Sequence, residues 1–145
     1  MTIRPRVVRA VRAARIHLRD VAAAEHMRRQ TEAEMAERDR QSAAQALATR
    51  LAAAPNQLAN ATSVSQVIRV INSVDVERED VARFAANASQ AHVQTAEAAQ
   101  QLRDRERAVR TIDRVADQMR EAKAHGEAKA EQAASDDLAA RNRPL

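Results

Sequence analysis

The chain has 145 residues, a net charge of +4, no cysteine, and Phe84 as its one aromatic residue. The lack of cysteine excludes disulfides and thiolate metal sites, and a hydrophobic fraction that is more than half alanine argues against an ordinary globular core. One glycine and three prolines leave few turns, so the composition predicts an all-α protein, a single elongated coiled-coil domain over residues 1–145.

The first predicted helix covers about residues 5–54 and opens on a basic stretch. Ile3–Arg19 holds six arginines and no acid, with apolar residues between them. At coiled-coil spacing these apolar residues form one stripe: Val7, Val11, Ala14, Leu18 and Val21. Four arginines fall across the helix from that stripe: Arg9, Arg12, Arg15 and Arg19. A second apolar run, from Ala33 to Ala54, continues in a shifted phase, which indicates a stutter in the supercoil.

Several interpretations of the arginine stretch are open. It is either a solvated outer face, a site for phosphates, an import presequence, a membrane-surface helix or the docking end for a protein partner. Nucleic acid is disfavoured because no aromatic residues are placed for stacking and the charge reverses along the chain. A presequence is disfavoured because the apolar stripe continues through Val21 with no processing boundary.

The second predicted helix, about residues 64–141, carries the most regular pattern. Alternate steps of three and four from Val67 to Ala133 meet mostly apolar residues over nearly ten heptads, which predicts a left-handed coiled coil. A connector is expected at about residues 55–63, starting at Pro55. Ser63 with Gln66 has capping-box spacing, but Asn72-Ser73 offers a later start, so an irregularity at 72–75 is left open.

The two helices are expected to fold back into an antiparallel hairpin, with a homodimeric coiled coil as the alternative. Residues 1–29 carry eight arginines against two acids, whereas residues 121–140 carry five acids against two lysines. A hairpin would place these opposite charges side by side, so we expect the basic and acidic ends to meet within the chain.

The start of the second helix holds the densest β-branched cluster. It comprises Val64, Val67, Ile68, Val70, Ile71, Val74 and Val76. Val67, Val70 and Val74 belong to the predicted stripe, whereas Val64, Ile68 and Ile71 do not all fit it. The cluster is either a locally wider core, a third short helix or an exposed apolar patch for a partner.

The sequence offers no enzyme site. No glycine-rich loop is present to hold phosphates, the four histidines are scattered, and only Glu121 with His125 has the spacing of two metal ligands on a helix. We therefore expect no catalytic residue, no metal and no cofactor. No stretch approaches the 18 uncharged apolar residues of a membrane span, so no direct membrane insertion is expected.

The last forty residues resemble a known family. The segment "EQAASDDLAAR", Glu131–Arg141, preceded by the arginine-rich Arg103–Arg110, looks like the C-terminal helix of FliJ/YscO-type proteins. These are the small central-stalk components of flagellar export and type III secretion machines. The chain length, the alanine-rich coiled coil and the basic N-terminal helix are similar too.

The resemblance implies a non-catalytic, monomeric stalk in the cytoplasm, at the inner face of the bacterial inner membrane. Its paired termini would engage a hexameric secretion ATPase, its hairpin tip would engage the export gate, and some members also bind export chaperones. When the family's arrangement is applied to this chain, the resemblance implies an ATPase-binding end that comprises Arg9, Arg12, Arg15, Arg19, Glu131, Gln132, Asp136 and Asp137. The export-gate tip comprises Val64, Val67, Ile68, Val70, Ile71 and Val74. The "DD" pair favours virulence over flagellar export slightly. The alternative function is a self-assembling coiled-coil scaffold.

Overall fold

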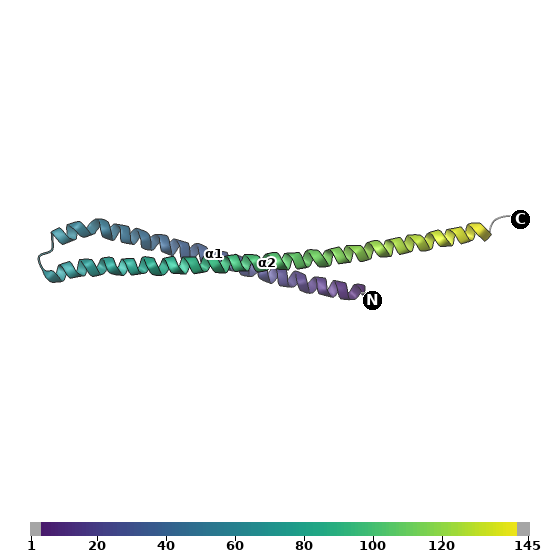
Figure 1. Ribbon diagram of the computed structural model, residues 1–145, viewed down its shortest axis with the longest axis horizontal. Helices are drawn as coiled ribbons and strands as arrows, with labels where there is room; N and C mark the ends of the chain where they lie inside the picture. Colours follow the sequence, from purple (N-terminus) through teal and green to yellow (C-terminus); the bar gives the residue numbers. More distant parts are fainter. Residues whose placement is uncertain (1–3, 142–145) are drawn as a thin grey trace. The chain divides into compact units, whose positions relative to one another are not determined.

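Two long helices make up the chain. The computed structural model describes residues 4–141, and the remaining residues of the predicted domain, 1–3 and 142–145, lie outside this range. Helix α1 runs from Pro5 to Ala59 and helix α2 from Val64 to Arg141 (Figure 1). The two helices pack against each other and the described residues contain no strand. The predicted all-α hairpin is confirmed.

Helix α1 extends beyond the end predicted for it. It continues through Pro55 to Ala59, so the connector is shorter than the predicted residues 55–63. A proline removes one N–H from the helix ladder and crowds the preceding turn, which is why residue 54 was the expected end. Here only the last turn follows the proline, and its N–H groups still find acceptors: Asn60 donates to the carbonyl of Asn56 at 3.1 Å.

The first turn of α2 is capped by side chains of the connector. Ser63 Oγ accepts a hydrogen bond from the Gln66 N–H at 3.3 Å, which is the first half of a capping box. The Gln66 side chain reaches one residue further back than the motif requires, and its Oε1 accepts from the Thr62 N–H at 2.6 Å. These bonds begin α2 at Val64, and residues 72–75 are regular helix within it.

The chain divides into two compact units, which we describe separately. Unit 1 comprises Met1–Val21 with Arg103–Leu145, and unit 2 comprises Ala22–Leu102. In unit 2 the helices run antiparallel, because Arg29 of α1 meets Gln94 of α2 while Arg50 meets Glu77. Small side chains form its buried contacts: Ala33, Ala43, Val74, Ala88 and Ala98. The last three belong to the stripe predicted for the second helix.

Unit 1 packs on a different face of α1 from the one predicted. Val8, Val109 and Ile112 are its buried residues, whereas Val7 and Val21 of the predicted stripe remain 51% and 54% exposed. Ala14 and the other two members, Val11 and Leu18, are exposed as well. One residue along a helix is a turn of about 100°, so α1 is rotated by one position relative to the prediction. The rotation brings arginines, rather than the valine stripe, against α2.

Candidate interaction surfaces

The exposed apolar residues at the start of α2, in unit 2, form a tip surface made of Val64, Ile68 and Ile71. Val64 is 75% exposed and the two isoleucines are each 50% exposed. Their spacing of four and three residues places them on one face of the helix. Among the other predicted tip residues, Val74 is buried, and Val67 and Val70 are half-buried toward α1. The cluster is thus partly core and partly surface, and it belongs to one continuous helix rather than to a third one.

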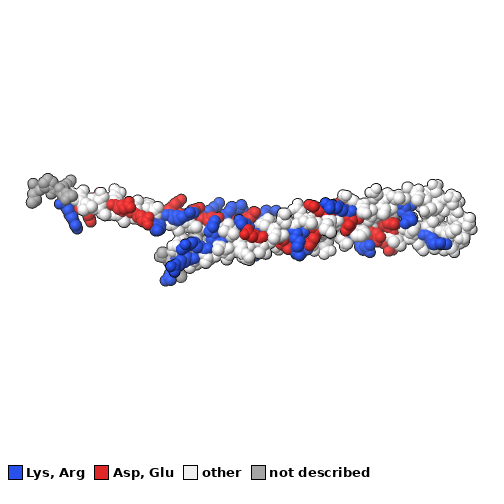
Figure 2. All heavy atoms as spheres, turned by 180° about the vertical axis from the view of Figure 1, so that it is seen from behind, with Lys and Arg blue, Asp and Glu red and all other residues white. Residues whose placement is uncertain are grey.

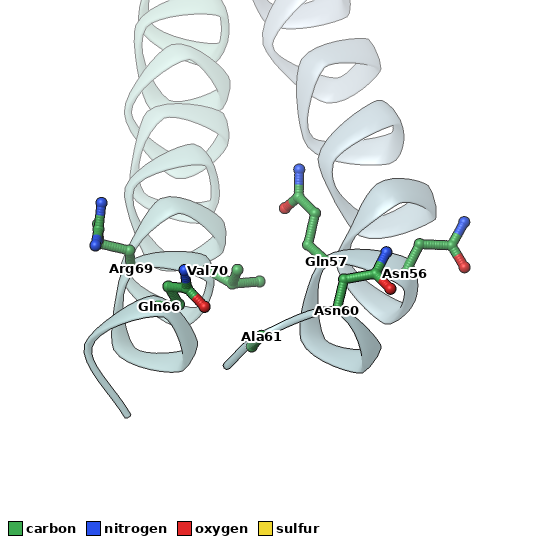
Figure 3. Close-up of a pocket in the computed structure, with 7 residues that line it drawn as sticks. All are labelled: Asn56, Gln57, Asn60, Ala61, Gln66, Arg69 and Val70. Atoms are coloured by element: carbon green, nitrogen blue, oxygen red, sulfur yellow. The ribbon is translucent and has the colours of Figure 1, made fainter. Parts of the chain in front are cut away.

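A shallow hollow of about 400 Å³ lies beside the tip surface, between the last turns of α1 and the first turns of α2. It is lined by Asn56, Gln57, Asn60, Ala61, Gln66, Arg69 and Val70, and Figure 3 shows Val70 pointing from α2 toward α1. Four of these side chains are amides, which can donate and accept hydrogen bonds but do no proton transfer. Asn56, Gln57, Asn60 and Ala61 of this lining fall within residues 55–63, the predicted connector.

Unit 1 contains a larger groove, of about 780 Å³, where α1 begins alongside α2. We call it the basic groove. Its apolar lining comes from Pro5, Val8, Ala116 and Met119, and its charged lining from Arg9, Arg12, Asp113, Asp117, Arg120 and Lys123. Four cations therefore face two carboxylates around an apolar floor. The sequence predicts Arg9 and Arg12 at this end but not the α2 side, of which Ala116, Met119 and Lys123 fall on the predicted stripe.

The four arginines predicted at the ATPase-binding end have different environments. Arg12 Nε lies 2.6 Å from Asp113 Oδ1, and Arg15 Nη1 donates to the carbonyl of Ala108 at 2.8 Å, so both face α2. Arg19 pairs with its neighbour Asp20 at 2.6 Å. Arg9 is exposed and joins none of the ion pairs among the described residues. The expectation that all four form a face across from the packed side is wrong for Arg12 and Arg15.

The acidic residues predicted for the same end lie elsewhere in unit 1. Glu131, Gln132, Asp136 and Asp137 are all exposed, as is every residue of α2 from 121 to 141. We call residues 121–141 the C-terminal segment. The helix register explains this placement: Arg12 lies opposite Asp113, so α1 reaches its first residue when α2 has reached about Met119. Within residues 4–141 the basic and acidic ends therefore do not meet, contrary to the expectation from the charges.

The charge distribution of unit 1 follows from this register. On the face shown in Figure 2, basic side chains gather at the start of α1 and acidic side chains lie toward the end of α2. Within the C-terminal segment Lys123 pairs with Glu127 of the same helix, at 3.5 Å. Glu131, Asp136 and Asp137 have no such partner among the described residues, so their carboxylates are available to another molecule.

A surface network in unit 2 perturbs two carboxyl groups. The hydrogen bond from Arg40 holds the pKa of Glu37 at about 2, well below its ordinary value, with a smaller contribution from Gln41. Hydrogen bonds from Arg28 and Arg29 likewise lower the pKa of Glu25. Both are pairs along α1, at spacings of three and four residues, and neither lies in the tip hollow or the basic groove. We interpret them as helix-stabilising contacts.

In residues 4–141 no cluster of three or more His, Asp or Glu side chains is placed to hold a metal ion. Neither described helix contains a stretch apolar enough to cross a membrane. Comparisons of the chain with protein-family models, with curated proteins and with solved structures gave no match.

Proposed function

We propose that the chain is a non-catalytic central stalk of a bacterial flagellar or type III secretion export apparatus. The observation that carries the proposal is that the chain leaves unpacked the two surfaces that such a stalk would use. One is the apolar tip surface at the start of α2, and the other is the C-terminal segment at its end, beside the basic groove. The resemblance of Glu131–Arg141 to the FliJ/YscO type assigns the partners.

The contact with the ATPase is supported by the unpaired charges of unit 1. A stalk inside a ring requires charged contacts that can be exchanged among subunits, since deep apolar contacts would fix it in one position. Arg9, Glu131, Asp136 and Asp137 are exposed and form no ion pair within the described chain. Arg12 and Arg15 hold α1 against α2 instead, and we assign them to the position of α1 rather than to the ATPase contact.

The contact with the export gate is supported by the tip surface. Val64, Ile68 and Ile71 form an apolar face that α1 does not cover, and exposed faces of this kind are common at protein interfaces. The neighbouring amide hollow could supply hydrogen bonds to the backbone of a bound segment. Together they offer an apolar anchor with polar groups at its side.

The test is co-purification from the native cells with a tag on the chain. We expect the hexameric ATPase and the gate protein to be retained. The Arg9→Glu variant combined with Asp136→Arg and Asp137→Arg should lose the ATPase and keep the gate. The Ile68→Asn and Ile71→Asn double variant should lose the gate and keep the ATPase, with helicity unchanged. Arg38→Glu, a charge reversal at an exposed site of unit 2 outside both surfaces, is the matched control and should keep both partners. Retention of neither partner by the wild-type chain would refute the proposal.

A self-assembling scaffold is the second candidate, and one observation favours it. The C-terminal segment exposes its whole circumference, including Leu138, which is 62% exposed. For a scaffold, we expect the molecular mass measured by solution scattering to increase with protein concentration. For a stalk, we expect the mass to stay constant. An open-ended series of masses would therefore move the assignment to the scaffold.

A further inference from the structure

The C-terminal segment carries a face that packs against nothing in the described chain, although Glu127 on it pairs with Lys123 along the same helix. Leu138 shares that face with Ala134, Glu131 and Glu127, at spacings of four, seven and eleven residues. Every one of these residues is exposed. A helix face with a leucine centre and a carboxylate row beside it is suited to a groove that is apolar at its floor and basic at its rim.

The basic groove of unit 1 has this chemistry. Val8 and Met119 supply its apolar floor, and Arg9, Arg12, Arg120 and Lys123 exceed the two carboxylates of its lining by two charges. From Glu127 to Arg141, the C-terminal segment has four carboxylates against Lys129 and Arg141, an excess of two negative charges. The groove and the segment are therefore complementary in both charge and hydrophobic character.

The segment cannot reach the groove of its own chain. Leu138 and Ala116, which lines the groove, are on the same continuous helix, 22 residues apart. At 1.5 Å per residue this separates them by roughly 33 Å. The occupant must come from another molecule, and a second copy of the chain supplies the matching segment.

We propose that two copies associate head to head, each inserting residues 134–138 of its C-terminal segment into the basic groove of the other. The two α2 helices then run antiparallel about a two-fold axis near Ala128. With Leu138 beside Met119 of the second copy, Asp137 lies across from Arg120, and Glu127 lies close to Lys129. A closed two-fold arrangement repeats each of these contacts twice. Parallel pairing would instead set Asp136 and Asp137 beside their own copies.

This dimer goes beyond the proposed function and does not rest on it, because it uses contacts between identical chains alone. It does cover Arg9, Glu131 and Asp137, which are among the residues proposed to bind the ATPase. The monomer expected from the family resemblance is then the species that binds the ATPase, and the dimer is a reversible resting form. Self-association can be measured on the purified chain with no ATPase present, so each proposal can fail without the other.

Engineered cysteines test the arrangement directly, because the natural chain has none. Two single variants, Met119→Cys and Leu138→Cys, are purified, mixed and oxidised. A disulfide needs Cβ atoms about 4 Å apart, so the mixture should form covalent dimers while each variant alone should not. In the proposed dimer two Leu138 positions are roughly 30 Å apart. Covalent dimers of Leu138→Cys alone would overturn the proposal in favour of parallel pairing, and no covalent dimer in the mixture would also overturn it.

Charge reversal supplies the second measurement. We expect sedimentation equilibrium of the wild-type chain to show a monomer–dimer equilibrium that weakens as salt rises. Arg9→Glu should weaken dimerisation about tenfold, and Arg69→Glu, the same change at an exposed site of unit 2, should not. Circular dichroism checks that each variant remains helical. A chain that stays monomeric at low salt and high concentration, or equal Kd values for the two variants, would overturn the proposal.

Discussion

Units 1 and 2 pack the same two helices by different chemistry. Unit 2 buries alanines and one valine, and its helices approach through small side chains such as Ala88, which is 2% exposed. Unit 1 buries the larger residues Val8, Val109 and Ile112 instead. Arginine side chains bond across the helix pair in both units, from Arg12 and Arg15 in unit 1 and from Arg29 and Arg50 in unit 2. This difference shows that an apolar stripe alone does not determine which face of a helix packs against its neighbour. The facing helix decides as well, because Asp113 and the Ala108 carbonyl offer acceptors to arginine.

The largest expected effect concerns the branched core of unit 1. Ile112→Ala should lower the free energy of unfolding by about 2–4 kcal/mol, because it removes buried methylenes and leaves a cavity at a site that is 8% exposed. The measurement is urea denaturation followed by circular dichroism. Ile71→Ala, at the exposed tip surface, should cost less than about 1 kcal/mol. Equal losses would mean that the two isoleucines are equally packed.

The next effect tests the close helix contact in unit 2. Ala88→Leu should lower the free energy of unfolding by about 1–3 kcal/mol, because the larger side chain does not fit between the helices. Ala85→Leu, three residues earlier and exposed, should change it by less than about 0.5 kcal/mol. The same denaturation measurement applies. A neutral or stabilising Ala88→Leu would show that the helices of unit 2 can move apart freely.

A smaller effect is expected from the arginine contacts of unit 1. Arg12→Gln combined with Arg15→Met should lower the local opening free energy of α1 near Ile16 by about 1 kcal/mol, since partly exposed charged bonds contribute little. Amide hydrogen exchange would report faster exchange in α1 of unit 1. Exchange around Ala43 in unit 2 should stay the same. Arg9→Gln, which removes no described bond, is the control and should leave both regions unchanged.

The smallest effect depends on pH and concerns unit 2. The pKa of Glu37 is lowered to about 2, chiefly by its hydrogen bond with Arg40. A lowered pKa stabilises the folded chain above the ordinary value near 4.5, and this contribution is lost as the pH falls toward about 2. Glu37→Gln should therefore flatten the fall in thermal midpoint over that range. An identical pH profile for wild type and variant would show that the pair contributes nothing.

The sequence predicted the helix stripe of α2 better than that of α1. Val74, Ala88, Ala98, Val109 and Ile112 lie on the predicted positions and are buried. The stripe failed beyond Met119, where the heptads continue but α1 has ended. The stripe predicted for the start of α1 was wrong as well. Alanine and arginine occur all around this part of the helix, so its faces differ little in hydrophobicity. Periodicity identifies a face that can pack, but the length of the partner helix and its polar groups decide whether it does.

The candidate interaction surfaces, too, could be predicted from the sequence only in part. The apolar residues at the start of α2 could be identified from their composition, but only the fold separates exposed Ile68 from buried Val74. The acidic residues of the C-terminal segment were identified too, whereas their distance from Arg9 follows from the difference in helix length. The basic groove could not be predicted, because it combines residues about 100 positions apart that no local pattern connects.

The four-residue connector, Asn60–Ser63, also has a consequence for how the chain folds. Pairs near the tip join residues that are close in sequence, whereas Arg12 and Asp113 are 101 residues apart. Loop-closure entropy rises with separation, so the helix pair is expected to close from the connector outward, with each contact shortening the loop that the next one must close. An added or deleted connector residue would then shift every later pairing. The arginine contacts of unit 1 would form last and would be the first to open.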